Sequence, residues 1–142
     1  MNYALKEAQK AYNKMDVPVG CVIVHNGKII ARGYNKREKD QNAIKHAEIE
    51  AIDKACKALK SWRLNDCTIY TTLFPCPMCA SAIQQSRISK LVYLNDTNNK
   101  VLNDISLNIL FNENLNHRVK IDRIFLENSI IDDFFEKIRK EK

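Results

Sequence analysis

The sequence predicts an α/β protein, a three-layer α/β/α sandwich built on a mixed five-stranded sheet. Short runs rich in β-branched and aromatic residues alternate with longer segments whose apolar residues recur at helical spacing. A hairpin near the N-terminus precedes strands that are separated by helices, an order typical of a sheet with antiparallel and parallel pairs. With 142 residues there is room for one ordinary core, so we expect a single domain over residues 1–142.

The N-terminal half predicts a helix, a hairpin and a second helix. Apolar residues recur at helical spacing in the first 14 residues, and Pro18 follows them. Asn26 and Gly27 stand between two apolar runs, as in a tight hairpin turn. The charged segment 37–45 is expected to be an exposed loop. The expected elements are a helix over 1–14, strands over 21–25 and 28–33, and a helix from 46 to 59.

The C-terminal half predicts three more strands and two or three helices. Pro75 and Pro77 bracket the entry to a helix, and Asn128 or Ser129 can cap the last one. The Asn-rich stretch 95–116 has the weakest pattern. The expected elements are strands over 68–72, 91–93 and 119–125, helices over 76–85 and from 128 or 129 onward, and a short helix over 106–111.

Composition narrows the class of protein. A hydrophobic content of 45% indicates a folded globular protein, and a net charge of +6 makes polyanions plausible partners. No apolar run is long enough to span a bilayer, and the first residues lack the features of a signal peptide, so we expect a cytoplasmic protein without a membrane segment. Five cysteines cannot all pair within one chain, and Cys21, Cys56 and Cys67 are expected to be small buried thiols.

Three residues have the types and spacing of zinc ligands. Cys76 and Cys79 form a Cys-x-x-Cys pair at the start of a predicted helix, where two sulfurs can hold one ion and the helix dipole favours the thiolate. His46 begins another predicted helix. A set of one His and two Cys leaves the fourth tetrahedral position open, which is typical of a catalytic zinc. His25 and His117 lack ligand spacing and are expected to be exposed or hydrogen-bonded.

Glu48 is the expected proton shuttle. Two thiolates and an imidazole balance the charge of Zn²⁺, so a bound water is the group that ionises, and a nearby carboxylate can take its proton and pass it to a leaving amine. Positions i and i+2 do not share a face of an ideal helix, so His46 and Glu48 converge only if the first turn points into the pocket. A redox dithiol is the main rival for the two cysteines. The combined His-x-Glu and Pro-Cys-x-x-Cys pattern favours a zinc-dependent nucleobase deaminase.

The motifs together resemble those of the bacterial tRNA adenosine deaminases, the TadA family. The resemblance covers nearly the whole chain and adds a C-terminal portion that shorter cytidine deaminases lack. The matching segments are 17–24, 33–35, 46–49, 75–79, 86–88, 116–119 and 133–135.

This resemblance implies a cytidine deaminase-like fold, one Zn²⁺ per subunit, and a homodimer that converts the wobble adenosine of a tRNA anticodon stem-loop to inosine. Among the substrate contacts that it implies, Asn35 hydrogen-bonds the flipped base and Val19 packs against it. Phe135 and Arg139, in the last helix, correspond to contacts with the anticodon loop. Alternatively, Phe135 is a core residue and Arg139 belongs to a solvated basic tail.

The chain departs from the family pattern in two places. Phe74 stands where the family usually has Glu, and residues 95–104 replace a glycine-containing loop that touches RNA. Neither departure touches the zinc ligands or Glu48, so both bear on substrate choice. Two alternatives therefore stay open: a zinc deaminase of a free base or nucleoside such as cytosine or guanine, and a non-catalytic zinc-binding subunit.

Overall fold

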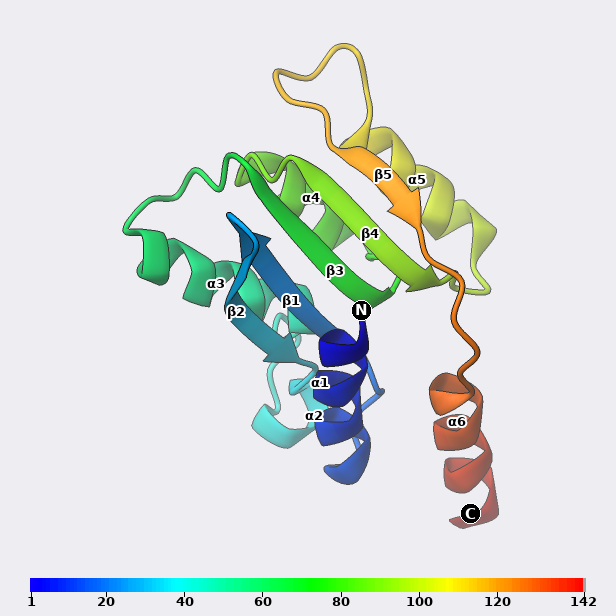
Figure 1. Ribbon diagram of the computed structural model, residues 1–142. Coiled ribbons are helices and arrows are strands. Elements are labelled where there is room, and N and C mark those ends of the chain that lie inside the picture. Colours follow the sequence, from blue (N-terminus) through cyan, green and yellow to red (C-terminus); the bar gives the residue numbers. More distant parts are fainter. Residues whose placement is uncertain (142) are drawn as a thin grey trace.

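The computed structural model describes residues 1–141 and contains one mixed five-stranded sheet (Figure 1). Its strand order is β2-β1-β3-β4-β5. β1 pairs antiparallel with β2 and β3, whereas β3, β4 and β5 run parallel. The expected α/β fold with a mixed sheet is confirmed. The strands are β1 (Gly20–His25), β2 (Lys28–Tyr34), β3 (Cys67–Leu73), β4 (Lys90–Asn95) and β5 (Lys120–Arg123).

Helices cover both faces of the sheet. α1 and α6 lie on one face, and α3, α4 and α5 lie on the other (Figure 1). No helix within residues 1–141 is long and apolar enough to cross a membrane. The helices are α1 (Asn2–Asn13), α2 (Arg37–Asp40), α3 (Ala47–Leu59), α4 (Pro77–Gln85), α5 (Lys100–Leu110) and α6 (Ile130–Glu141).

The packing of α3 on β2 is unusually close. α3 presents Ala47, Ala51 and Ala55 to the sheet, and all three are fully buried. A Cβ added at Gly33 in β2 would lie only 2.3 Å from the Ala47 carbonyl oxygen. Small residues on both elements therefore place the N-terminus of α3 directly against the sheet, at the end where β2 leads into the site.

Two segments differ from the sequence-based expectation. The segment 37–45 is not wholly loop, because the carboxylate of Asp16 accepts hydrogen bonds from the backbone N–H groups of Glu38 and Lys39 and stabilises the short helix α2. The short helix expected over 106–111 starts six residues earlier and forms α5. The side chain of Asn99 caps it by accepting a hydrogen bond from the Leu102 N–H, so an Asn-rich segment contains a helix start.

Candidate metal centre and active site

Two helix N-termini meet at the candidate site. His46 is the N-cap residue of α3, with extended backbone angles of φ −81° and ψ 155°. Cys76 is the N-cap of α4, with φ −68° and ψ 168°, and Pro77 follows as the first helical residue. Because His46 stands before the helix, the rule for positions i and i+2 on a helix does not apply. The imidazole and Glu48 can therefore both belong to the same pocket.

The three expected ligands lie close together. The His46 Nδ1 atom is 3.7 Å from Cys76 Sγ and 3.5 Å from Cys79 Sγ, and the three ligand atoms are within 4.8 Å of one another. Tetrahedral zinc, with Zn–S bonds of about 2.3 Å and Zn–N bonds of about 2.0 Å, places sulfur and nitrogen about 3.5 Å apart. Both His–Cys distances therefore fit a tetrahedral zinc ion.

Electrostatics also prepares the site for a dication. The hydrogen bond from the Cys79 thiol lowers the pKa of Cys76 to about 4, with a smaller contribution from His46. The same bond raises the pKa of Cys79, and the hydrogen bond to Cys76 raises the pKa of His46. An anionic sulfur thus stands beside a protonatable imidazole and a second thiol, whose protons a metal ion displaces.

Glu48 is a buried carboxyl group beside these ligands. Only 3% of the residue is exposed, and burial raises the pKa of its carboxyl group. A carboxyl group whose charged form is disfavoured in this way can take up a proton and release it within one reaction cycle. This is the property expected of a proton shuttle.

A cavity of about 160 Å³ adjoins the ligands His46 and Cys76. Val19 and Asn35, the two residues that were expected to contact the base, both line it. The Asn35 side chain is held from both ends, because its Nδ2 donates to the Val17 carbonyl at 3.1 Å and its Oδ1 accepts from the Arg37 N–H at 3.1 Å. The lining residues are Val17, Val19, Asn35, Arg37, His46, Ala47, Glu48, Leu73, Phe74, Cys76 and Thr97.

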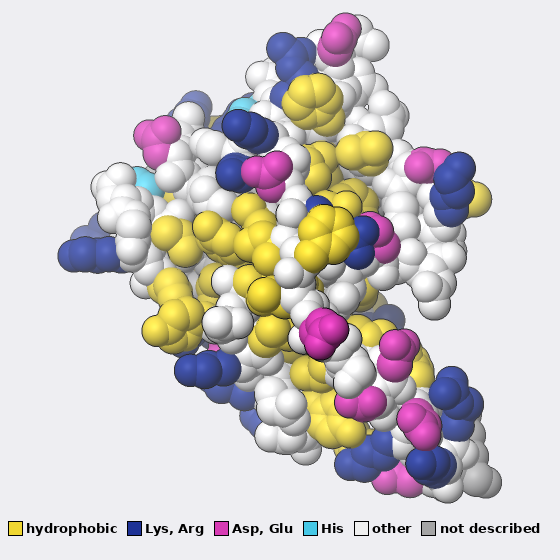
Figure 2. All heavy atoms as spheres, turned by 45° about the vertical axis from the view of Figure 1, so that its right-hand side comes forward, with side chains coloured by type: hydrophobic (Ala, Val, Ile, Leu, Met, Phe, Trp, Pro, Cys, Tyr) yellow, Lys and Arg dark blue, Asp and Glu magenta, His cyan; other side chains and the backbone are white. Residues whose placement is uncertain are grey.

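A second, larger cavity of about 360 Å³ adjoins the first. The two share Val17, Leu73 and Thr97 as lining residues. Phe135 lines this second cavity and is 43% exposed, so it is not a core residue. Arg139 is exposed on the same helix but lines neither cavity. Figure 2 shows acidic and basic side chains mixed along this projecting helix, at lower right.

Sequence reasoning missed two parts of the cavity wall. Phe74, noted only as a departure from the family, is buried against the Tyr93 ring at 4.9 Å between centroids and lines the cavity over the ligands. Arg37 was assigned to an exposed loop, yet it also lines this cavity. The only sequence signal for Arg37 was a positive charge two residues after Asn35.

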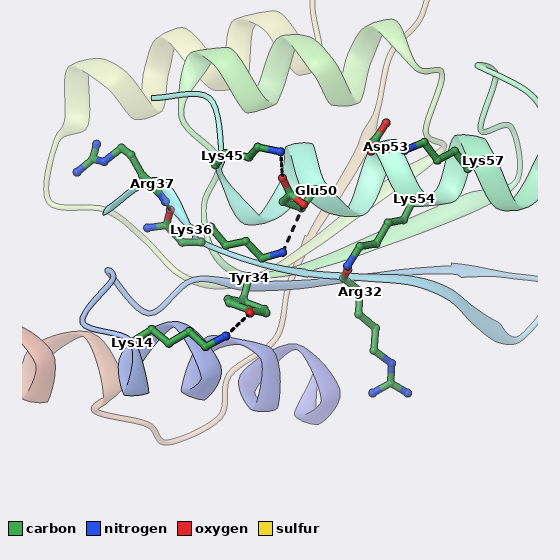
Figure 3. A network of polar contacts seen from close by, with 11 residues as sticks. Lys14, Arg32, Tyr34, Lys36, Arg37, Lys45, Glu50, Asp53, Lys54 and Lys57 are labelled. Atoms are coloured by element: carbon green, nitrogen blue, oxygen red, sulfur yellow. Dashed lines mark hydrogen bonds and ion pairs between the residues drawn. The ribbon is translucent and has the colours of Figure 1, made fainter. Parts of the chain in front are cut away.

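Glu50 joins the two chain segments that lead into the cavity (Figure 3). Its carboxylate lies 3.6 Å from Lys36 Nζ and 3.0 Å from Lys45 Nζ. Lys36 follows Asn35 and Lys45 precedes His46, and the backbone N–H of Lys36 donates to the Lys45 carbonyl at 2.9 Å. The network therefore fixes the Asn35 amide and the His46 imidazole relative to each other.

Comparisons with known proteins agree with this chemistry. Residues 1–95 match the model of the cytidine and deoxycytidylate deaminase zinc-binding region. The whole chain is 44% identical to the tRNA-specific adenosine deaminase of Bacillus subtilis (strain 168), covering 90% of that protein. It is 43% identical to the protein of that name from Rickettsia bellii, with 98% of this chain and 99% of the relative covered.

Two solved structures share the fold of this chain. A structure from studies of A-to-I editing by tRNA:A34 deaminases at the wobble position has a TM-score of 0.79 at 34% identity, covering 87% of this chain and 95% of that chain. The guanine deaminase from Bacillus subtilis has a TM-score of 0.67 at 29% identity, covering 98% and 90%. The chain therefore belongs to the tRNA-specific adenosine deaminases, within the zinc-dependent cytidine and deoxycytidylate deaminase family.

Proposed function

We propose that this protein hydrolyses the wobble adenosine of a tRNA anticodon loop to inosine, releasing ammonia. The observation that carries the proposal is a cluster of three zinc-ligand side chains, two of which, His46 and Cys76, line one base-sized cavity together with the buried carboxyl group of Glu48. The choice of tRNA is supported by identity of 44% over the full chain to proteins named tRNA-specific adenosine deaminase, against 29% to guanine deaminase.

In this proposal His46, Cys76 and Cys79 bind the zinc ion. When bound, zinc supplies a site at which the pKa of a water molecule falls toward neutrality. Glu48 takes the water's proton on its carboxylate and delivers it to the departing amino group, so that one water is consumed and one ammonia leaves. Because the carboxyl group is buried, the proton stays within the cavity between the two transfers.

The cavity walls position the base for this reaction. Asn35 cannot rotate freely, because the Val17 carbonyl and the Arg37 N–H hold its two ends, so its amide is preorganised to meet a base edge. Val19 and Phe74 provide apolar contact surface for a base that has left its stack. The predicted roles of Phe135 and Arg139 at the anticodon loop stay predictions, and only Phe135 lies beside a cavity that adjoins the base site.

We also propose that the enzyme acts as a homodimer in the cytoplasm, on tRNA. The support for the dimer is the resemblance to the family, together with large apolar side chains that α5 leaves exposed. Val101 is 69% exposed and Leu107 is 47% exposed. Exposed apolar surface of this kind is typical of an interface between proteins.

The direct test compares RNA with free bases. Purified zinc-loaded protein is incubated with an anticodon stem-loop that carries a wobble adenosine, with a matched stem-loop that carries guanosine there, and with free cytosine and guanine. We expect inosine and ammonia only from the first RNA, and loss of activity when a chelator removes zinc. Turnover of a free base without turnover of the RNA would replace the proposal with the free-base alternative.

A further inference from the structure

We propose that Arg37 binds a backbone phosphate next to the adenosine that enters the cavity. The inference rests on the proposed function and extends it from the base to the chain that carries the base. The cavity of about 160 Å³ over the ligands is sized for a base, so the ribose and its flanking phosphates must remain at the rim. A rim that receives a phosphodiester needs a cationic group within reach.

Among the residues that line the base cavity, Arg37 is the single lysine or arginine. It makes no ion pair with any acidic side chain in residues 1–141, and Figure 3 shows its guanidinium group free of the dashed contacts that occupy Lys36 and Lys45. Those two lysines are already bound to Glu50. A free guanidinium at this place has five N–H donors available for phosphate oxygens.

The adjoining cavity offers no cationic lining residue to a phosphate. Asp96 and Asp132 line it, Asp96 is already paired with Arg123 at 2.7 Å, and no lysine or arginine is among its lining residues. It is also rich in amides, which suit base edges better than phosphates: Asn95, Asn98 and Asn128. The RNA chain is therefore expected to cross the mouth with a phosphate toward Arg37 and the neighbouring base toward the amide-lined cavity.

The backbone that carries Arg37 is held in place before RNA binds. The Arg37 N–H donates to Asn35 Oδ1 at 3.1 Å, and the Asp16 carboxylate fixes the next two N–H groups, those of Glu38 and Lys39. The same Asn35 amide is expected to contact the base. One side chain thus couples the position of the base to the position of the proposed phosphate site, which lowers the ordering cost of binding.

The test uses a charge-matched control. Arg37→Gln and Arg32→Gln remove the same charge. Arg32 is exposed on β2, lies over the Tyr3 ring at 5.0 Å, and extends at the other side of the network in Figure 3. We expect Arg37→Gln to weaken binding of the anticodon stem-loop about tenfold and to reduce the slope of log Kd against log salt by about 0.7–1, one phosphate contact. Arg32→Gln should match the wild type, and Arg37→Lys should restore most of the salt slope.

A neutral backbone identifies the phosphate. Methylphosphonate replaces, one at a time, the phosphates on the 5′ and 3′ sides of the target adenosine. At one of the two positions the methylphosphonate should lower the affinity of the wild type about tenfold. The same methylphosphonate should hardly lower the affinity of Arg37→Gln below its value for the unmodified RNA. The inference is overturned if Arg37→Gln binds the stem-loop as tightly as Arg32→Gln does. It is also overturned if each methylphosphonate lowers the affinity of Arg37→Gln as much as it lowers that of the wild type.

The two proposals fail in different ways. If the wild type binds the stem-loop but forms no inosine, the proposed reaction is wrong, and the comparison of binding by the two glutamine variants still decides the role of Arg37. If the wild type does not bind the stem-loop at all, both are wrong. Arg37 makes no side-chain hydrogen bond within residues 1–141, so its replacement should leave the thermal unfolding midpoint unchanged.

Discussion

Replacement of Gly33 by alanine tests whether the close approach of α3 to the sheet sets the catalytic geometry. The added Cβ would lie 2.3 Å from the Ala47 carbonyl oxygen and 2.9 Å from the Ala51 nitrogen, both backbone atoms of α3. A backbone atom cannot rotate aside as a side-chain tip can. The N-terminus of α3 must therefore retreat by about 1 Å before the contact becomes an ordinary one.

The retreat acts directly on the site. Ala47 stands between His46 and Glu48 in the chain, so both groups move with its carbonyl. Overpacking of a tight contact costs about 1–3 kcal/mol, which for a domain of this size lowers Tm by roughly 3–12 °C. A misplacement of about 1 Å at catalytic groups can reduce a rate about 100-fold. We expect Gly33→Ala to lose far more activity than stability.

Gly27→Ala is the matched control. Gly27 lies in the hairpin turn with φ +76°, and a Cβ there would meet no atom within 4 Å. Its replacement should cost about 1 kcal/mol of backbone strain and leave kcat and bound zinc unchanged. The measurements are thermal unfolding, zinc content and kcat on the anticodon stem-loop. A Gly33→Ala variant with the wild-type rate would show that the contact does not position the site.

Two further predictions concern carboxylates with separate tasks. Glu48→Gln should retain zinc, because the ligand set lies elsewhere, and should lose about 10²–10⁴-fold in kcat; activity near the wild-type level would rule out the proton shuttle. Glu50→Gln removes the partner of Lys36 and Lys45 and should lower kcat measurably but by less than about tenfold, because those lysines lie partly in water. Retained zinc with an unchanged rate would show that the loop holds its shape without Glu50.

The metal site was predictable because its signal is local. Cys76 and Cys79 are three residues apart, and the spacing alone brings two sulfurs to one ion once Pro77 starts a helix. His46 was predicted as the third ligand because histidine is a common zinc ligand and because this residue stands at the start of another predicted helix. Within an ideal helix His46 and Glu48 would not share a face. In the structure His46 is the N-cap residue of α3 and its backbone is extended, so the two side chains can enter the same pocket.

The placement of α2 and α5 was less predictable. α2 is stabilised by a side chain that is distant in the sequence, and α5 begins within a segment whose composition does not favour a helix. Asp16 stabilises α2 from more than twenty residues away. Periodicity within a segment carries no information about such a partner. Asn99 acts locally, but an Asn-rich stretch offers several possible caps, so the sequence alone does not show where α5 begins.

The walls of the cavity over the zinc ligands depend on strand pairing, which is why substrate selection was harder to infer than the metal site. β3 and β4 run parallel with Leu73 opposite Asn95, and the Phe74 N–H donates to the Asn95 carbonyl at 2.8 Å. This pairing brings residues 95–98 to the mouth of the cavity that Phe74 closes. The two departures from the family pattern are therefore neighbours in space. A change of substrate preference in this chain should arise where they meet, at the position of the base next to the target adenosine.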